Sequence, residues 1–144
     1  CAKFISYCSK KAGADSKINA NMTTAYDISK DTVDNKGGLI TFVDSECYNE
    51  RVSERMFNSP RVYYNASYAP RKGDLLIVFN SSKTNDGKYY HHTFRHIGIV
   101  YADDSYWQDG FSTIEGNMGN KVTKYTKRGT FSGERIGAFV TPAW

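Results

Sequence analysis

The sequence lacks a long apolar run, and it contains only three prolines and three cysteines. No apolar stretch approaches the roughly 18 residues that a membrane-spanning helix needs, so we expect no membrane span. Three cysteines are an odd number, which excludes a framework in which every cysteine is paired. The cysteines and histidines are also not clustered at the spacing of a zinc site. Eleven tyrosines against three prolines indicate a folded chain rather than a disordered one.

Length and charge narrow the class of protein further. The 144 residues are enough for one domain with its own core, and we expect a single monomeric domain over 1–144, excised from a longer protein with other modules. The net charge of +4 mildly favours anionic partners such as cell-wall polymers. Because the basic residues are dispersed rather than clustered, the sequence predicts no binding to nucleic acid.

The first half of the chain carries helical patterns. The apolar face of the first pattern consists of Cys1, Phe4, Ile5, Cys8 and Ala12. This spacing predicts an amphipathic helix, and Gly13 marks its end. Two further helices are expected over 20–29 and 45–58, the second with Ser45 as its N-cap.

After Pro70 the pattern changes to that of strands. Strands are predicted over 74–79, 96–101, 111–115, 122–126 and 136–140. The residues between the first two, 80–93, predict a polar loop. Helices followed by strands are typical of an α+β protein, here with N-terminal helices packed on an antiparallel sheet of about five to six strands.

Three residues predict a catalytic site. Cys1 lies at the start of the first helix, where unpaired backbone amides and the helix dipole favour a thiolate, the nucleophilic form of cysteine. The turn-rich segment 103–110 lies midway between His96 and Glu115, so a symmetric hairpin would place the two opposite each other with their Cβ atoms about 5 Å apart. A carboxylate beside an imidazole fixes its tautomer and stabilises the imidazolium. Asn117, two residues further on, could hydrogen-bond the same ring.

Four stretches of the chain resemble the CHAP family, the cysteine- and histidine-dependent amidohydrolases and peptidases. They are the nucleophile helix (1–8), the Pro-x-x-Gly-Asp start of the first core strand (70–76), the histidine strand (95–100) and the end of the acidic strand (113–117). The motifs occur in the order and at the approximate spacing of the family. No single motif is decisive, but the combination is fairly specific.

The resemblance implies a fold, an activity and a set of roles. The fold would be papain-like, with Cys1 as nucleophile, His96 as base, Glu115 as the acid that orients it, and Asn117 as a fourth polar member. The reaction would be hydrolysis of an amide bond in bacterial peptidoglycan through a thioacyl-enzyme. The protein would be an N-acetylmuramoyl-L-alanine amidase or a D,L- or D,D-endopeptidase, acting outside the cell at the wall or as part of a phage. We expect no cofactor and no metal, because the acidic calcium-binding loop of some relatives has no counterpart here.

Other readings of the same residues stay open. Cys1 could be an inert small residue, or an N-terminal nucleophile that uses its own α-amine as base. His91 and His92 are rival bases, although a polar loop would position them poorly. Cys8 and Cys47 are expected in the core.

The aromatic residues expected near the mouth of the site are Tyr89, Tyr90, Tyr106 and Trp107. They could bind the sugars or stem peptides of a substrate, or they could merely pack their loops. Two other functions remain as alternatives to a peptidoglycan hydrolase. One is a thiol amidase that acts on an amide outside the wall, and the other is a catalytically inactive module that binds the wall.

Overall fold

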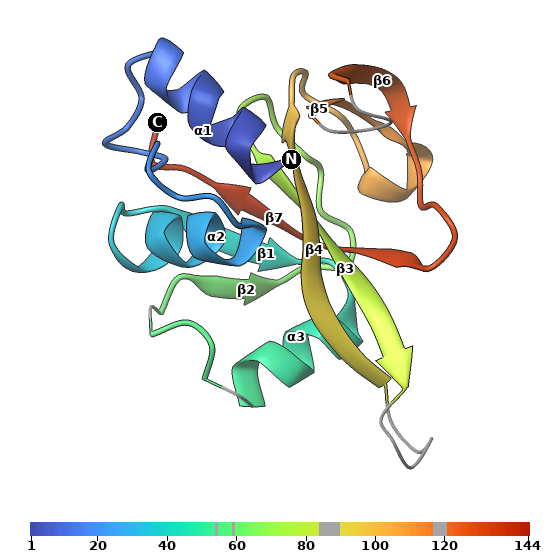
Figure 1. Ribbon diagram of the computed structural model, residues 1–144. Coiled ribbons are helices and arrows are strands. Elements are labelled where there is room, and N and C mark those ends of the chain that lie inside the picture. Colours follow the sequence, from blue (N-terminus) through green and yellow to red (C-terminus); the bar gives the residue numbers. More distant parts are fainter. Residues whose placement is uncertain (54, 59, 84–89, 117–120) are drawn as a thin grey trace.

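The computed structural model describes residues 1–53, 55–58, 60–83, 90–116 and 121–144, and Figure 1 shows their arrangement. The expected site residues Tyr89 and Asn117 therefore lie outside the described residues. No helix in the described part of the chain is long and apolar enough to cross a membrane.

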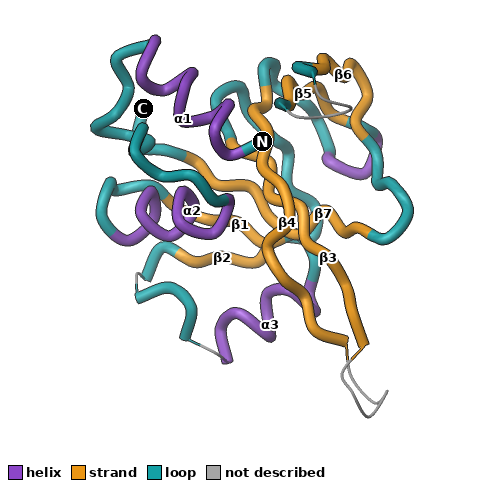
Figure 2. The backbone as a smooth tube through the Cα atoms, viewed as in Figure 1, coloured by secondary structure: helices purple, strands orange, loops and turns teal. Residues whose placement is uncertain are grey.

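The first half of the chain contains three helices and two short strands, and strands dominate the second (Figure 2). The helices are α1 (Ala2–Lys11), α2 (Ala25–Asp34) and α3 (Ser45–Ser53), with a short 3-10 helix η1 (Trp107–Asp109). The strands are β1 (Leu39–Phe42), β2 (Val62–Tyr64), β3 (Leu75–Lys83), β4 (Tyr90–Val100), β5 (Phe111–Glu115), β6 (Thr123–Arg128) and β7 (Glu134–Thr141). The α+β class predicted from the sequence is confirmed.

The strands form one sheet with the order β2-β1-β7-β3-β4-β5-β6 within the described residues. β1 and β2 pair in parallel, and the other neighbouring strands pair antiparallel. The expected antiparallel sheet of five to six strands is therefore wrong in two respects, because the described sheet has seven strands and is mixed. β1 and β2 escaped prediction because they are only four and three residues long, too short to show a period.

α1 begins and ends close to the predicted positions. Cys1 is its N-cap, and Gly13 follows its end with a φ of +67°, a conformation that favours glycine. The buried face differs from the predicted one, because Ser6 and Ser9 are buried while Cys8 is half-buried. Both serine hydroxyls donate to backbone carbonyls of the segment that follows the helix, so burial leaves them satisfied.

The other two helices begin and end at different residues from those predicted. α2 starts at Ala25 instead of residue 20, because Thr24 caps it by accepting a hydrogen bond from the amide of Asp27 at 3.0 Å. α3 starts at Ser45, but its cap is Asp44 rather than Ser45, since Asp44 Oδ1 accepts from the amide of Cys47 at 3.0 Å. α3 ends at Ser53, several residues before the predicted end.

The prediction of a polar loop over 80–93 is wrong for those of its residues that the structure describes. β3 continues to Lys83 and β4 begins at Tyr90, so the two strands form a long hairpin that extends beyond the sheet in Figure 1. His91 and His92 consequently lie in β4, not in a loop.

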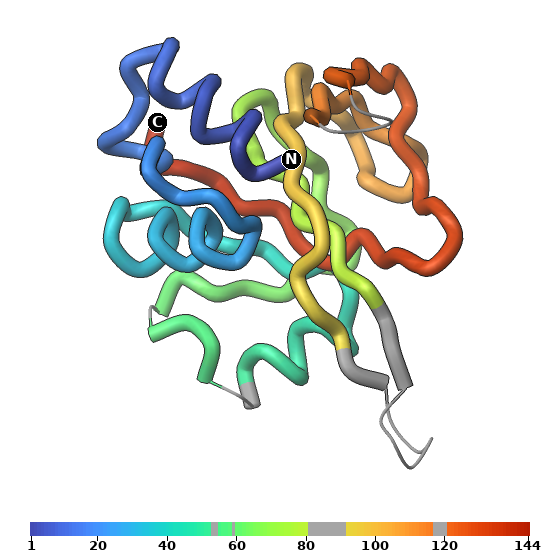
Figure 3. Tube along the Cα trace, viewed as in Figure 1, coloured from blue at the N-terminus to red at the C-terminus, as the bar shows by residue number. Residues whose placement is uncertain are grey.

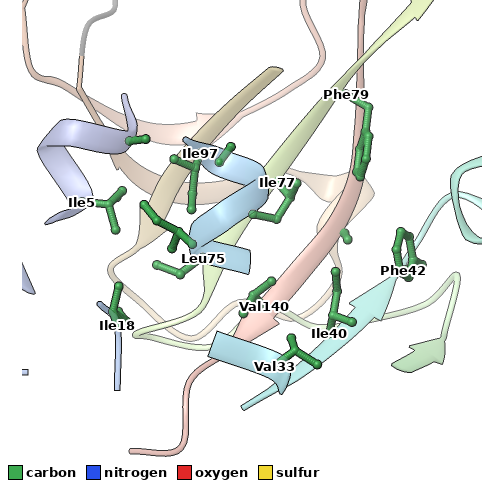
Figure 4. Close-up of a cluster of buried hydrophobic side chains, with 14 of the residues drawn as sticks. Ile5, Ile18, Val33, Ile40, Phe42, Leu75, Ile77, Phe79, Ile97 and Val140 are labelled. Atoms are coloured by element: carbon green, nitrogen blue, oxygen red, sulfur yellow. The ribbon is translucent and has the colours of Figure 1, made fainter. Parts of the chain in front are cut away.

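The main core lies between the helices and one face of the sheet. α1 and α2 both pack against β4, and α2 also packs against β1 and β7. Their buried residues join those of the strands, as Figure 4 shows for Ile5, Leu75, Ile77 and Ile97. This packing fixes the first turn of α1 beside β4, and the N-terminus of the chain lies there in Figure 3.

Candidate active site

His96 and Glu115 form a buried pair between β4 and β5. His96 Nε2 lies 2.7 Å from Glu115 Oε1, and the two residues are 8% and 0% exposed. The predicted proximity of these two residues is confirmed. The predicted register, with His96 directly opposite Glu115, is wrong. Ile99 lies opposite Ile114, which places Glu115 beside Gly98 and diagonally from His96.

Gly98 makes this diagonal contact possible. A Cβ built on Gly98 would lie 2.5 Å from Cγ of Glu115, so a larger residue at position 98 would displace the carboxylate. The side chain of Glu115 therefore occupies the space that a side chain at position 98 would fill.

Two further side chains hold the second oxygen of Glu115. Arg128 Nε donates to Glu115 Oε2 at 2.8 Å, and the hydroxyl of Thr113 donates to the same oxygen. Burial by itself raises the pKa of this carboxyl, but the hydrogen bonds from His96, Arg128 and Thr113 outweigh burial and lower it to about 2. Glu115 is thus a carboxylate with a fixed orientation, one oxygen of which faces the imidazole.

Arg128 is the residue of this site that sequence reasoning missed. It is 1% exposed, its Nη1 lies 3.0 Å from Glu134 Oε1, and its guanidinium lies 4.4 Å from the ring centroid of Phe131. Burial opposes its charge, but Glu115 and Glu134 raise its pKa. It lies just beyond the predicted end of its strand. Only a general rule could have pointed to it: a buried carboxylate such as Glu115 normally has a cationic partner.

Cys1 lies at the start of α1, the helix that packs against β4. It is half-buried and lines a cavity together with Phe94 and Arg95, the two residues that precede His96. On the other strand, Gly116 follows Glu115, and a Cβ there would collide with Phe4 of α1. The first turn of α1 is therefore held against the neighbours of His96 on β4 and of Glu115 on β5.

The thiol of Cys1 makes no hydrogen bond to His96 within the part of the chain that the structure describes. Because Glu115 takes Nε2 of the ring, Nδ1 is the nitrogen that could exchange a proton with a thiol. Thiol–imidazole contacts are often long in enzymes without substrate. The described residues bring a thiol-bearing helix start near a buried imidazole–carboxylate pair, the three side-chain types that a cysteine hydrolase needs.

Comparisons of the chain with protein-family models, with curated proteins and with solved structures find no match. The site is therefore interpreted from its own geometry.

The expected aromatic residues that the structure describes have the following surroundings. Trp107 donates from its indole nitrogen to the carbonyl of Ala66 at 2.7 Å, and it packs beside Tyr68. Tyr106 stacks edge-on against Trp107. Tyr90 begins β4, about 20 Å along the strand from His96. Their role in binding a substrate stays a prediction.

The other histidines and cysteines have different surroundings. His92 is buried, and its Nε2 lies 3.1 Å from Glu46 Oε2 of α3. Burial raises the pKa of the Cys8 and Cys47 thiols, and Asp44 raises that of Cys47 further. No group of three or more His, Cys, Asp or Glu side chains among the described residues could hold a metal ion.

Proposed function

We propose that this protein is a papain-like cysteine hydrolase of the CHAP type that cleaves an amide bond in bacterial peptidoglycan. The observation that carries the proposal is the buried His96–Glu115 pair beside the helix that starts with Cys1. The resemblance of four sequence motifs to that family supports the proposal. The same resemblance supports an extracellular or phage-associated setting.

In the first half of the proposed reaction, the thiolate of Cys1 attacks the carbonyl carbon of the amide. His96 holds the proton taken from the thiol and delivers it to the leaving nitrogen as the C–N bond breaks. The amine departs, and the acyl group stays on sulfur as a thioester. Glu115 keeps the imidazole in one orientation and stabilises its charged form.

In the second half, water replaces the amine. His96 takes a proton from water, the hydroxyl oxygen attacks the thioester carbon, and the C–S bond breaks. The products are a carboxylic acid and the restored thiol. Asn117, the proposed fourth polar member, lies outside the described residues.

A second candidate function is an inactive module that binds the wall. The lack of a hydrogen bond between the Cys1 thiol and the His96 ring favours this reading. A thiol amidase that acts on an amide outside the wall would share the chemistry and differ only in substrate.

The deciding experiment is digestion of a panel of purified peptidoglycans, with mass spectrometry of the soluble products. The wild type should release fragments whose masses separate an amidase from an endopeptidase. Cys1→Ala and His96→Ala should release none. Products from the wild type and from both variants alike would refute the proposed roles.

The chain offers a matched control for each variant. Cys8→Ala removes a thiol about two turns further along α1, and His92→Gln removes a second buried histidine that pairs with a glutamate. Both should retain turnover. If no wall is digested by a folded wild type, pelleting with walls tests the binding module, and a library of soluble amides tests the non-wall amidase.

A further inference from the structure

A cavity of about 430 Å³ lies beside Cys1. The first residues of α1 and α2 form two of its walls, and Phe94 and Arg95 of β4 form a third. Phe94 packs edge-on against Tyr26, another lining residue, with ring centroids 5.3 Å apart. The cavity therefore combines an aromatic wall with the proposed nucleophile.

The charged side chains that line the cavity are both cationic. They are Lys3, two residues after the thiol, and Arg95, and no Asp or Glu is among the described lining residues. Asp27, in the first turn of α2, is not a lining residue. A cavity with charges of one sign selects for ligands of the opposite sign.

A local irregularity of the sheet places Arg95 at the cavity. The register between β3 and β4 shifts here, so that Val78 pairs with His96 and Phe79 with Phe94. Arg95 is left without a partner on β3, as the extra residue of a bulge. It donates to Asn80 through Nη1 at 2.8 Å, and a guanidinium has four further N–H donors.

The backbone of both helices adds to the same charge preference. Thr24 satisfies the amide of Asp27, but Ala25 and Tyr26 belong to the first turn of α2, whose amides have no intrahelical acceptor. Ala2 and Lys3 likewise belong to the first turn of α1, whose amides have no intrahelical acceptor. All four residues line the cavity, so the positive ends of two helix dipoles meet there.

We infer that this cavity binds a carboxylate of the substrate, within about one residue of the amide bond that is cut. The inference rests on the proposed function for the position of the scissile bond, and it names what that site recognises: an acidic peptide rather than a neutral one. Lys3 and Arg95 bind the carboxylate, and Phe94 and Tyr26 pack against its apolar neighbours.

Binding to the inactive Cys1→Ala variant tests the inference without requiring turnover. The probes are two forms of N-acetyl-L-alanyl-γ-D-glutamyl-L-lysine amide, one with the D-glutamyl α-carboxyl free and one with it amidated. Titrations followed by ¹⁵N NMR should show the free acid binding about tenfold more tightly, with shifts at Lys3 and Arg95. The difference should shrink as salt is added.

Two further variants separate the cavity from the general charge of the protein. Lys3→Gln with Arg95→Gln, in the Cys1→Ala background, should remove the preference for the free acid. Lys10→Gln, at the other end of the same helix and outside the cavity, should retain it. Equal binding of the two probes would overturn the inference, and so would a preference that survives the double substitution.

Failure of the proposed function would look different. Suppose that Cys1→Ala prefers the free acid, while the wild type turns over neither probe and no wall. This outcome would support the carboxylate site and refute the proposed hydrolase activity. If the wild type turns over both probes with equal kcat/KM, the proposed hydrolase activity is supported and the proposed carboxylate site is refuted.

Discussion

Gly98 and Glu115 lie side by side on neighbouring strands. The side chain of Glu115 occupies the space that a side chain at position 98 would fill. Through that space Glu115 reaches His96, which is not its direct partner in the sheet. A glycine inside a strand weakens it, and Gly98 lies two residues before the end of β4. Here it serves to bring a carboxylate to the proposed catalytic base.

The substitution Gly98→Ala should separate the pair. The new methyl would meet Cγ of Glu115 at 2.5 Å, and we expect a loss of about 1–3 kcal/mol in the free energy of unfolding, together with a fall in kcat. Urea denaturation and product release from walls measure the two effects. Gly129→Ala is the control, because nothing lies within 4 Å of a Cβ there. Equal effects at the two glycines would contradict the explanation.

Removal of Arg128 should leave a buried carboxylate without its cation. We expect Arg128→Met to lower the free energy of unfolding by about 3–5 kcal/mol, the typical result of breaking a buried ion pair on one side. Arg135→Met is the matched substitution at a half-exposed arginine that also bridges two acids, and it should cost less than about 1 kcal/mol. Urea denaturation compares the two, and similar losses would refute the special role of Arg128.

Stability should depend on pH through Glu115. Its pKa is lowered from 4.5 to about 2 in the folded state, so its contribution is fully present above pH 4.5 and is lost as the pH falls toward 2. The shift corresponds to about 3 kcal/mol. Urea denaturation between pH 6 and pH 2 measures this loss. Glu115→Gln should flatten the curve over that range, and a curve parallel to that of the wild type would show that another group is responsible.

The three thiols should react in a defined order. Burial raises the pKa of Cys8 and Cys47, and Cys47 is 0% exposed, so iodoacetamide should modify Cys1 first and Cys47 only after unfolding. If the imidazole stabilises the thiolate, His96→Gln should slow the labelling of Cys1 at pH 7 by about tenfold. Peptide mapping by mass spectrometry measures each rate. Faster labelling of Cys8 than of Cys1 would argue against an activated Cys1.

Local patterns predicted the parts of the site that depend on local structure. The spacing of apolar residues and Gly13 identified α1, and β5 was predicted over its full length. The turn-rich segment between His96 and Glu115 was enough to bring their strands together. It could not give the register, because a shift of two residues keeps the same face of each strand.

Features that depend on distant parts of the chain were not predicted. Arg128 is charged and lies at a strand end, so nothing local marks it as buried; its burial follows from Glu115 and Phe131 around it. The bulge at Arg95 coincides with a second irregularity, because the register of β3 shifts on either side of Val78, against β4 after it and against β7 before it. Such adjustments arise from packing across the sheet.

The position of β7 inside the sheet has a consequence for how the molecule assembles. β7 pairs with β1 on one side and β3 on the other, so it alone connects the pair β2-β1 to the group β3-β4-β5-β6 among the described strands. During synthesis, the ribosome has produced both groups before the strand that joins them. Until residue 141 has emerged, the edges of β1 and β3 that β7 covers lack their partner and are open to other chains, so we expect the two groups of strands to join only after that point.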